Sequence, residues 1–182
     1  MIESMIESRI ESRIESMIES MIEQNDSKLL DTWTLWAHLP NDTNWELTSY
    51  RQICDIQSIK EAITLTENLP EQIVKTSMLF LMRKGIYPTW EDPSNRNGGC
   101  FSFKINNKMV YNTWKTLSYV LFGETLTNET LSNTITGITI SPKKNFCIIK
   151  IWISNCDNTH PSILKDIEPL NKQTCLFKKH IS

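Results

Sequence analysis

Two tryptophans stand in polar surroundings, where an exposed ring could bind a ligand. Trp45 follows the polar stretch 40–44. Trp90 lies in a segment rich in Pro, Asn and Gly, directly before Glu91 and Asp92. A large aromatic side chain on a polar loop exposes apolar surface unless something stacks on it. Two such rings can hold a flat ligand between them, and their electron-rich faces favour a cation. A neighbouring carboxylate can accept hydrogen bonds from the ligand edge. The residue types therefore indicate a site for a planar, positively charged group with hydrogen-bond donors, and packing of both rings within their loops is the alternative.

Other residues frame this candidate site. Trp33, Trp36 and Trp114 fall within regular apolar patterns, which favours core packing for them. A basic turn at Lys143 and Lys144 could hold an anionic extension of the same ligand.

Support for an enzyme is weak. The sequence has no nucleophile-elbow, phosphate-loop, dinucleotide-binding or metalloprotease motif. A Cys–His pair such as Cys100 with His38 is a nucleophilic candidate without a local signature. The cysteines and histidines show no metal-ligand spacing. We therefore expect no catalytic residue, no metal and no cofactor.

Composition places the chain among ordinary globular proteins. It has 182 residues, of which 40% are hydrophobic and 22% charged, and a formal net charge of −2. A charge so close to zero argues against a protein that coats nucleic acid by charge alone. No run of roughly 18 or more apolar residues occurs, so no membrane span is expected. Five cysteines without a C-x-x-C pair or a secretory signal favour reduced thiols in the cytoplasm.

The first residues are repetitive. Residues 1–23 repeat the unit MIES, or a close variant, with a period of four. On a helix four residues advance about 400°, so each Ile lags the one before it by about 40° and no straight apolar seam forms. This pattern favours a frayed helix or a disordered tail over a coiled coil, with a partner-binding amphipathic helix as an alternative. We divide the chain into a tail over 1–30 and one folded domain over 31–182.

Apolar periodicity indicates the elements that must position the two rings. Strands are expected over 32–39, 45–54, 77–83, 101–105, 134–140, 146–153 and 174–181. Helices are expected over 57–66, 114–122 and 163–167, with a long loop over 88–99. Strands interrupted by separate helices predict an α+β fold with a largely antiparallel sheet.

The order and spacing of these residues resemble the messenger-RNA cap-binding initiation factor, the four-E class of eukaryotic translation initiation factors. The resemblance runs from about residue 31 to 156 and is carried by Trp33-x-x-Trp36, Trp45, Pro88-x-Trp90-Glu91-Asp92 with Asn95 and Gly98-Gly99, Trp114, Gly123-Glu124 and Trp152. It implies a curved, largely antiparallel sheet with about three helices on its convex face. It also implies a monomeric, non-enzymatic protein of the cytoplasm that binds the 7-methylguanosine cap at the 5′ end of messenger RNA.

The resemblance assigns roles to four side chains around the cap. Trp45 and Trp90 would stack on the two faces of the methylated guanine, which is a flat cation. Glu91 would accept hydrogen bonds from its N1–H and N2–H groups. Trp152 would contact the N7 methyl group.

Phosphate binding departs from the family pattern. Lys143 stands where the family has an Arg, and lysine lacks the bidentate fork of that residue. The second family position falls on Ile148, for which Lys150 on the same strand face is the expected substitute. The Arg that usually follows the Gly-Gly pair is Cys100. We expect Lys143, Lys144 and Lys150 to bind the phosphates loosely.

The convex face departs as well, and this leaves three functions open. The Trp with which the family binds scaffold and repressor helices falls on Ile63, and a smaller aliphatic side chain weakens such an anchor. The chain could recruit capped mRNA to a scaffold initiation factor or its viral counterpart. It could also be a cap-binding repressor or decoy that does not engage the usual scaffold. A cap hydrolase is a third function, for which the sequence supplies no carboxylate cluster. The abundance of Ile and Asn and the tandem repeat suggest a large DNA virus or a divergent protist as the source.

Overall fold

One antiparallel sheet organises residues 27–39 and 42–181, the part of the chain that the computed structural model describes. Its seven strands are β1 (Lys28–His38), β2 (Tyr50–Ser58), β3 (Met78–Arg83), β4 (Gly99–Asn106), β5 (Ile135–Pro142), β6 (Phe146–Ile153) and β7 (Leu176–Lys179). They lie in the order β2-β1-β3-β5-β6-β4-β7, and neighbours are antiparallel throughout.

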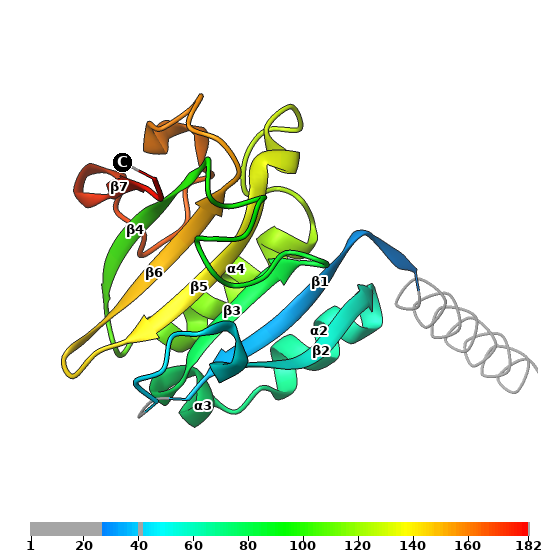
Figure 1. Ribbon diagram of the computed structural model, residues 1–182. Coiled ribbons are helices and arrows are strands. Elements are labelled where there is room, and N and C mark those ends of the chain that lie inside the picture. Colours follow the sequence, from blue (N-terminus) through cyan, green and yellow to red (C-terminus); the bar gives the residue numbers. More distant parts are fainter. Residues whose placement is uncertain (1–26, 40–41, 182) are drawn as a thin grey trace, which may run out of the picture.

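The α-helices of the described residues lie behind the sheet in Figure 1, and they are α2 (Ile59–Asn68), α3 (Glu71–Thr76) and α4 (Val110–Phe122). None of these helices is long and apolar enough to cross a membrane. The architecture confirms the predicted α+β class.

The predicted tail lies mostly outside the described residues. The repeat over 1–23 belongs to the part without a description, and β1 begins at Lys28, inside the segment 1–30.

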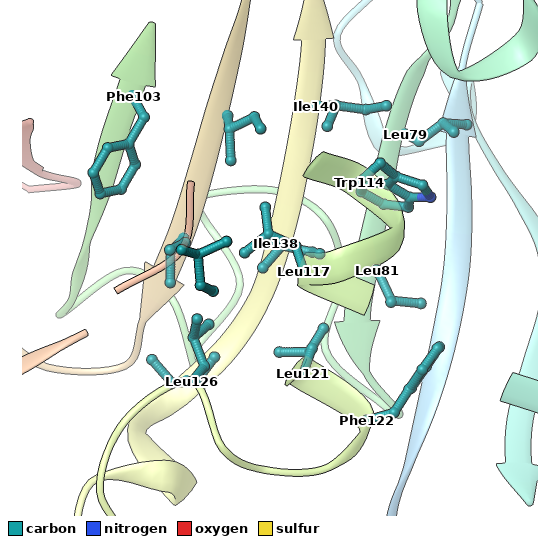
Figure 2. Packing of buried hydrophobic residues seen from close by; sticks show 14 of the residues in the cluster. Leu79, Leu81, Phe103, Trp114, Leu117, Leu121, Phe122, Leu126, Ile138 and Ile140 are labelled. Atoms are coloured by element: carbon teal, nitrogen blue, oxygen red, sulfur yellow. The ribbon is translucent and has the colours of Figure 1, made fainter. Parts of the chain in front are cut away.

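The helices pack on one face of the sheet. Alternate residues of β4, namely Phe101, Phe103 and Ile105, are buried, as their spacing predicts. Figure 2 shows Trp114 and Leu117 of α4 over the same layer of side chains. Burial of side chains of this size contributes about 1.5–3 kcal/mol each. The helical layer therefore holds the sheet in one shape and leaves its other face available for a site.

A second, smaller apolar cluster lies on the open face. It contains Phe80, Met82 and Trp152, with Trp36 packed against it. Trp33 is fully buried in the main core, as predicted, whereas Trp36 points to the opposite face because the two differ in strand parity. The open face thus has an aromatic floor before any loop is added.

The helix predicted over 57–66 and the hairpin predicted over 134–153 are confirmed, as α2 and as β5 with β6. A capping box fixes the start of α2: the hydroxyl of Ser58 accepts the backbone N–H of Glu61 at 3.2 Å, and the Glu61 carboxylate accepts that of Ser58 at 3.1 Å. Helix α3 was not predicted, because six residues are too few to show a helical period.

The helix predicted over 163–167 is wrong. A single 3-10 turn, η3 (Pro161–Ile163), takes its place among the described residues. Leu164 and Ile167 are buried against the main core from irregular chain. Short apolar runs do not distinguish a helix from other buried segments, and that ambiguity caused the error.

Candidate functional site

A cavity of about 270 Å³ opens on the face of the sheet that the helices leave uncovered. It is lined by Trp45, Tyr50, Met78, Phe80, Pro88, Thr89, Trp90, Glu91, Lys150 and Trp152. The fold therefore brings together both loop tryptophans, the carboxylate that follows one of them, and one of the three candidate lysines.

Trp45 lies in a loop, so the start of the strand predicted over 45–54 is wrong. The backbone N–H of Asn44 donates to the Asp42 carboxylate at 2.8 Å, and that of Glu46 donates to the Asn44 side chain at 2.9 Å. Such local side-chain bonds compete with strand pairing, and β2 begins only at Tyr50. The Trp45 ring is consequently 59% exposed.

His38 supports the Trp45 ring from one side. The two rings stack with centroids 4.3 Å apart and planes 4° from parallel. His38 is buried, and its Nε2 lies 2.8 Å from the carbonyl oxygen of Asn44. One face of the Trp45 indole is thus covered by the protein, and the ring is held in place for contact on its other face.

Two buried polar side chains hold the loop that carries Trp90. The Asp92 carboxylate accepts the backbone N–H of Tyr87 at 2.9 Å. The Asn95 amide donates to the carbonyl oxygens of Tyr87 and Thr89 at 3.1 and 2.8 Å, and its side chain is fully buried. The Trp90 ring remains 49% exposed on this braced loop. The loop is therefore preformed around its aromatic side chain.

Trp152 forms part of the cavity floor. Its side chain is only 6% exposed, and its Nε1–H donates to the hydroxyl of Thr139 on the neighbouring strand at 2.8 Å. Because the indole N–H is already satisfied, the ring offers apolar contact rather than a hydrogen bond.

Charge inside the cavity is sparse. Burial raises the pKa of Tyr50, and the nearby Glu91 carboxylate raises it further. Tyr50 therefore stays a neutral hydroxyl at physiological pH. Glu91 is the acidic side chain of the cavity lining and Lys150 its basic one.

The other predicted site residues lie elsewhere. Lys143 and Lys144 are exposed in the turn between β5 and β6, outside the cavity lining. Ile63 lies on α2 and is 37% exposed. It lines a second, apolar cavity of about 290 Å³, together with Lys28, Leu29, Leu30, Ile59, Ala62, Tyr119, Phe122 and Gly123.

The nucleophilic pair considered from the sequence does not form. His38 is on β1 and Cys100 on β4, four steps apart in the strand order. At about 4.8 Å per step the two positions are separated by about 19 Å along the sheet. Within the described residues no cluster of His, Cys, Asp and Glu could hold a metal ion.

Comparison with known proteins adds the family. The sequence model described as "Eukaryotic initiation factor 4E" matches residues 28–181. This chain belongs to that family. The membership confirms the resemblance of the sequence and the prediction of a translation factor rather than an enzyme.

Relatives are distant. The chain is 32% identical over 136 residues to the eukaryotic translation initiation factor 4E homolog of Acanthamoeba polyphaga mimivirus. The aligned region covers 63% of this chain and 50% of that protein. It is 28% identical over 153 residues to eukaryotic translation initiation factor 4E of Candida glabrata, covering 81% and 68%. The chain thus spans half the length of the mimivirus relative.

Solved structures share the fold. One is the complex of C. elegans eIF4E-3 with the 4E-binding protein Mextli and cap analog, with a TM-score of 0.67, 16% identity, and coverage of 75% of this chain and 79% of that chain. Another is Ascaris suum eIF4E-3 with m7G cap, with a TM-score of 0.66, 19% identity, and coverage of 75% and 78%. These likenesses confirm the cupped-hand sheet.

Sequence reasoning missed two supporting residues. The sequence indicated His38 only as the partner of Cys100 in a nucleophilic pair. It indicated Asn95 only as part of the motif around Trp90. Neither role has a local signal: the His38 stack depends on where β1 ends, and Asn95 acts through carbonyl groups six and eight residues away.

Proposed function

We propose that the chain binds the 7-methylguanosine cap at the 5′ end of messenger RNA and recruits capped mRNA for translation initiation in the cytoplasm, acting as a monomer. The observation that carries the proposal is the cavity in which two half-exposed tryptophans, a carboxylate and a third tryptophan meet. This is the set of groups that a flat cation with donors on one edge requires. Two solved relatives of the same fold are named in complex with a cap analog or the m7G cap.

Each group has a task in this proposal. Trp45 and Trp90 stack on the two faces of the methylated guanine, and stacking contributes about 1–3 kcal/mol per base. Glu91 accepts the N1–H and N2–H groups, while the backbone N–H of Trp90 donates to O6. Trp152 contacts the N7 methyl group through its apolar ring surface. Methylation at N7 supplies the positive charge that the electron-rich rings favour.

A second candidate function is a cap-binding repressor or decoy. The observation in its favour is on the helical face, where the apolar cavity around Ile63 has no large aromatic anchor on α2. Glu67 beside it is bonded to Lys115 Nζ at 2.5 Å and to the Tyr119 hydroxyl at 2.6 Å. A polar bridge between α2 and α4 resists burial under an apolar partner helix. This alternative keeps the cap cavity and loses only the usual scaffold.

Tryptophan fluorescence tests the cap cavity. We expect 7-methyl-GTP to quench the emission at lower concentration than GTP, because GTP lacks the charge on the ring. Trp90→Ala should weaken binding of 7-methyl-GTP by about tenfold to a hundredfold.

Thr48→Ala is the matched control, because Thr48 is exposed three residues after Trp45 and lines neither this cavity nor the one that adjoins it. Its affinity should equal that of the wild type. Binding by Trp90→Ala within about threefold of the wild type would contradict the stacked arrangement.

A further inference from the structure

The strand register places a lysine of β7 in the same row as the cavity floor. Trp152 of β6 is paired with Cys100 of β4, and Cys100 is paired on its other side with Lys178 of β7. Directly paired residues of antiparallel strands point to the same face, and adjacent strands are about 4.8 Å apart. Lys178 therefore stands about 10 Å from Trp152 across the sheet, on the open face. Lys150 is one row further along, paired with Ser102.

Packing on both faces confirms this orientation of β7. Phe177 faces the helical side, where its ring lies 4.9 Å from that of Phe101. Its neighbour Lys178 must then face the open side. His180 shares that parity, and its ring centroid lies 4.8 Å from that of Trp152. The end of β7 is thus packed against the site itself.

The chain after β7 is also tied to the loop of Trp90. The backbone N–H of His180 donates to the carbonyl oxygen of Gly98 at 3.0 Å, and its Nδ1 lies 2.7 Å from the carbonyl oxygen of Asn95. Asn95 is the buried residue that braces the Trp90 loop. The same loop therefore fixes the position of the aromatic ring and that of the terminal strand.

The charged side chains that β6 and β7 contribute to this part of the open face are lysines. Burial lowers the pKa of His180, and the charges of Lys150 and Lys178 lower it as well, against the opposing effects of the Asn95 hydrogen bond and the Glu91 carboxylate. Both lysines therefore lie within electrostatic reach of His180, which is neutral at physiological pH. Neither Lys150 nor Lys178 takes part in an ion pair among the described residues. The residues of β4, β6 and β7 that face this side include no Asp or Glu. An anion placed here meets the two ammonium groups, and the Glu91 carboxylate of the cavity lining is the acidic group within electrostatic reach of the same histidine.

The turn lysines are further away. Lys143 precedes Phe146, which starts β6 six residues before Trp152. At about 3.3 Å per residue, β6 alone places that turn about 20 Å from the cavity floor. Lys178 is about half as far, and it lies in the direction of β7 rather than along the hairpin.

We propose that Lys178 and Lys150 bind the phosphate chain of the nucleotide whose base occupies the cavity, so that the chain leaves across β4 toward β7. The inference rests on the proposed function of the cavity. The ligand chemistry is that of a 5′-linked phosphate chain, held by two point charges that give attraction without bidentate geometry.

Binding of a ligand series tests the inference. 7-Methylguanosine, 7-methyl-GMP and 7-methyl-GTP are titrated against the wild type, Lys178→Ala and Lys150→Ala. In the wild type the affinity should rise along the series, and this rise should shrink with added salt. Lys178→Ala should reduce affinity for 7-methyl-GTP by about three- to tenfold and leave that for 7-methylguanosine unchanged.

Lys179→Ala is the matched control, because Lys179 is the next residue of the same strand and is exposed on the opposite face. It should leave the whole series unchanged, and the double variant Lys143→Ala/Lys144→Ala should lose less affinity for the triphosphate than Lys178→Ala. Equal affinities of Lys178→Ala and Lys179→Ala for the triphosphate, with 7-methylguanosine still bound, would overturn the inference and leave the cap cavity standing. Failure of the wild type to bind any methylated ligand would overturn both.

Discussion

Glu91 distinguishes this cavity from a simple aromatic clamp. It is the acidic residue of the lining, and it lies next to Trp90, so in the proposed cap site stacking and edge recognition would come from consecutive residues. Asp92 cannot share the task, because it is buried and both its carboxylate oxygens accept backbone N–H groups. The two adjacent carboxylates thus have separate roles, one in the ligand site and one in the loop.

Glu91→Gln should weaken binding of 7-methyl-GTP by about tenfold to a hundredfold and leave thermal stability unchanged. The amide presents one acceptor and one donor, so one of the two hydrogen bonds to the base becomes a donor–donor clash. Isothermal titration calorimetry measures the loss, and a thermal melt checks the fold. Glu129→Gln serves as the control, since Glu129 is exposed and lines neither this cavity nor the one that adjoins it at Trp45 and Glu91. Equal effects of the two variants would mean that Glu91 acts only through overall charge.

At the scale of elements, a buried arginine ties the sheet to the end of α4. Arg83 of β3 is bound by the Glu124 carboxylate through two contacts of 2.6 and 2.5 Å, and by Asp31 of β1 at 2.7 Å. Its guanidinium also lies 4.5 Å above the Trp33 ring. Burial lowers the pKa of Arg83, but the hydrogen bonds to Glu124 and Asp31 outweigh this and raise it above its ordinary value.

The end of α4 differs in detail from its sequence pattern. Gly123 follows the helix as expected but has a φ of −81°, while Glu124 adopts the left-handed value of 54°. A non-glycine residue there costs about 1–3 kcal/mol unless its surroundings hold it. The two bonds between Arg83 and the Glu124 carboxylate keep Glu124 in this conformation. The strained backbone therefore indicates that this ion pair contributes to stability.

Glu124→Gln should lower the free energy of unfolding by about 1–3 kcal/mol, because a buried guanidinium loses one of its two anionic partners while Asp31 remains. Urea denaturation followed by circular dichroism measures the change. Glu129→Gln, an exposed position in the same loop, should change the free energy of unfolding by no more than about 0.5 kcal/mol. An unchanged midpoint for Glu124→Gln would show that Asp31 alone suffices for Arg83.

The whole molecule presents two separate surfaces. The sheet carries the aromatic cavity on one face, and the helices cover the other, where the apolar cavity around Ile63 opens between β1, α2 and α4. Because the core lies between them, a ligand in one cavity does not contact residues of the other.

Variants of Ile63 separate recruitment from repression. Ile63→Trp should strengthen binding of a labelled helical peptide from a 4E-binding protein by about tenfold, because an aromatic anchor fills the apolar cavity better. Ile63→Asp should abolish that binding. Fluorescence anisotropy measures the peptide, and 7-methyl-GTP affinity, which should be unchanged in both variants, is the control. If the wild type binds the peptide, the result supports recruitment of capped mRNA. If only Ile63→Trp binds it, the result supports the repressor or decoy.

The sequence by itself determined most of the strands, two of the three α-helices that the structure describes and the residue types that line the cavity. Alternation at Phe101, Phe103 and Ile105 is local and was sufficient to predict β4 with its buried face. Polar neighbours marked Trp45 and Trp90 as unusual, and adjacency marked Glu91. These inferences needed only residues close in the chain, whose conformation depends on local sterics and side-chain patterning.

Only the tertiary structure decided which of these residues meet. The end of β1 lies beside the start of β3, because His38 pairs with Met78, so the segment after β3 must return over the open face to bring Trp90 into the cavity with Trp45. Lys150 enters that cavity while Lys143 stays in the turn. No sequence pattern indicated that Lys178 lies near the cavity, because its place opposite Cys100 follows from the register of β7 on β4. A shift of one residue would turn it to the helical face. Such pairings join residues far apart in the chain and are set by packing of the entire sheet, so no local pattern contains them.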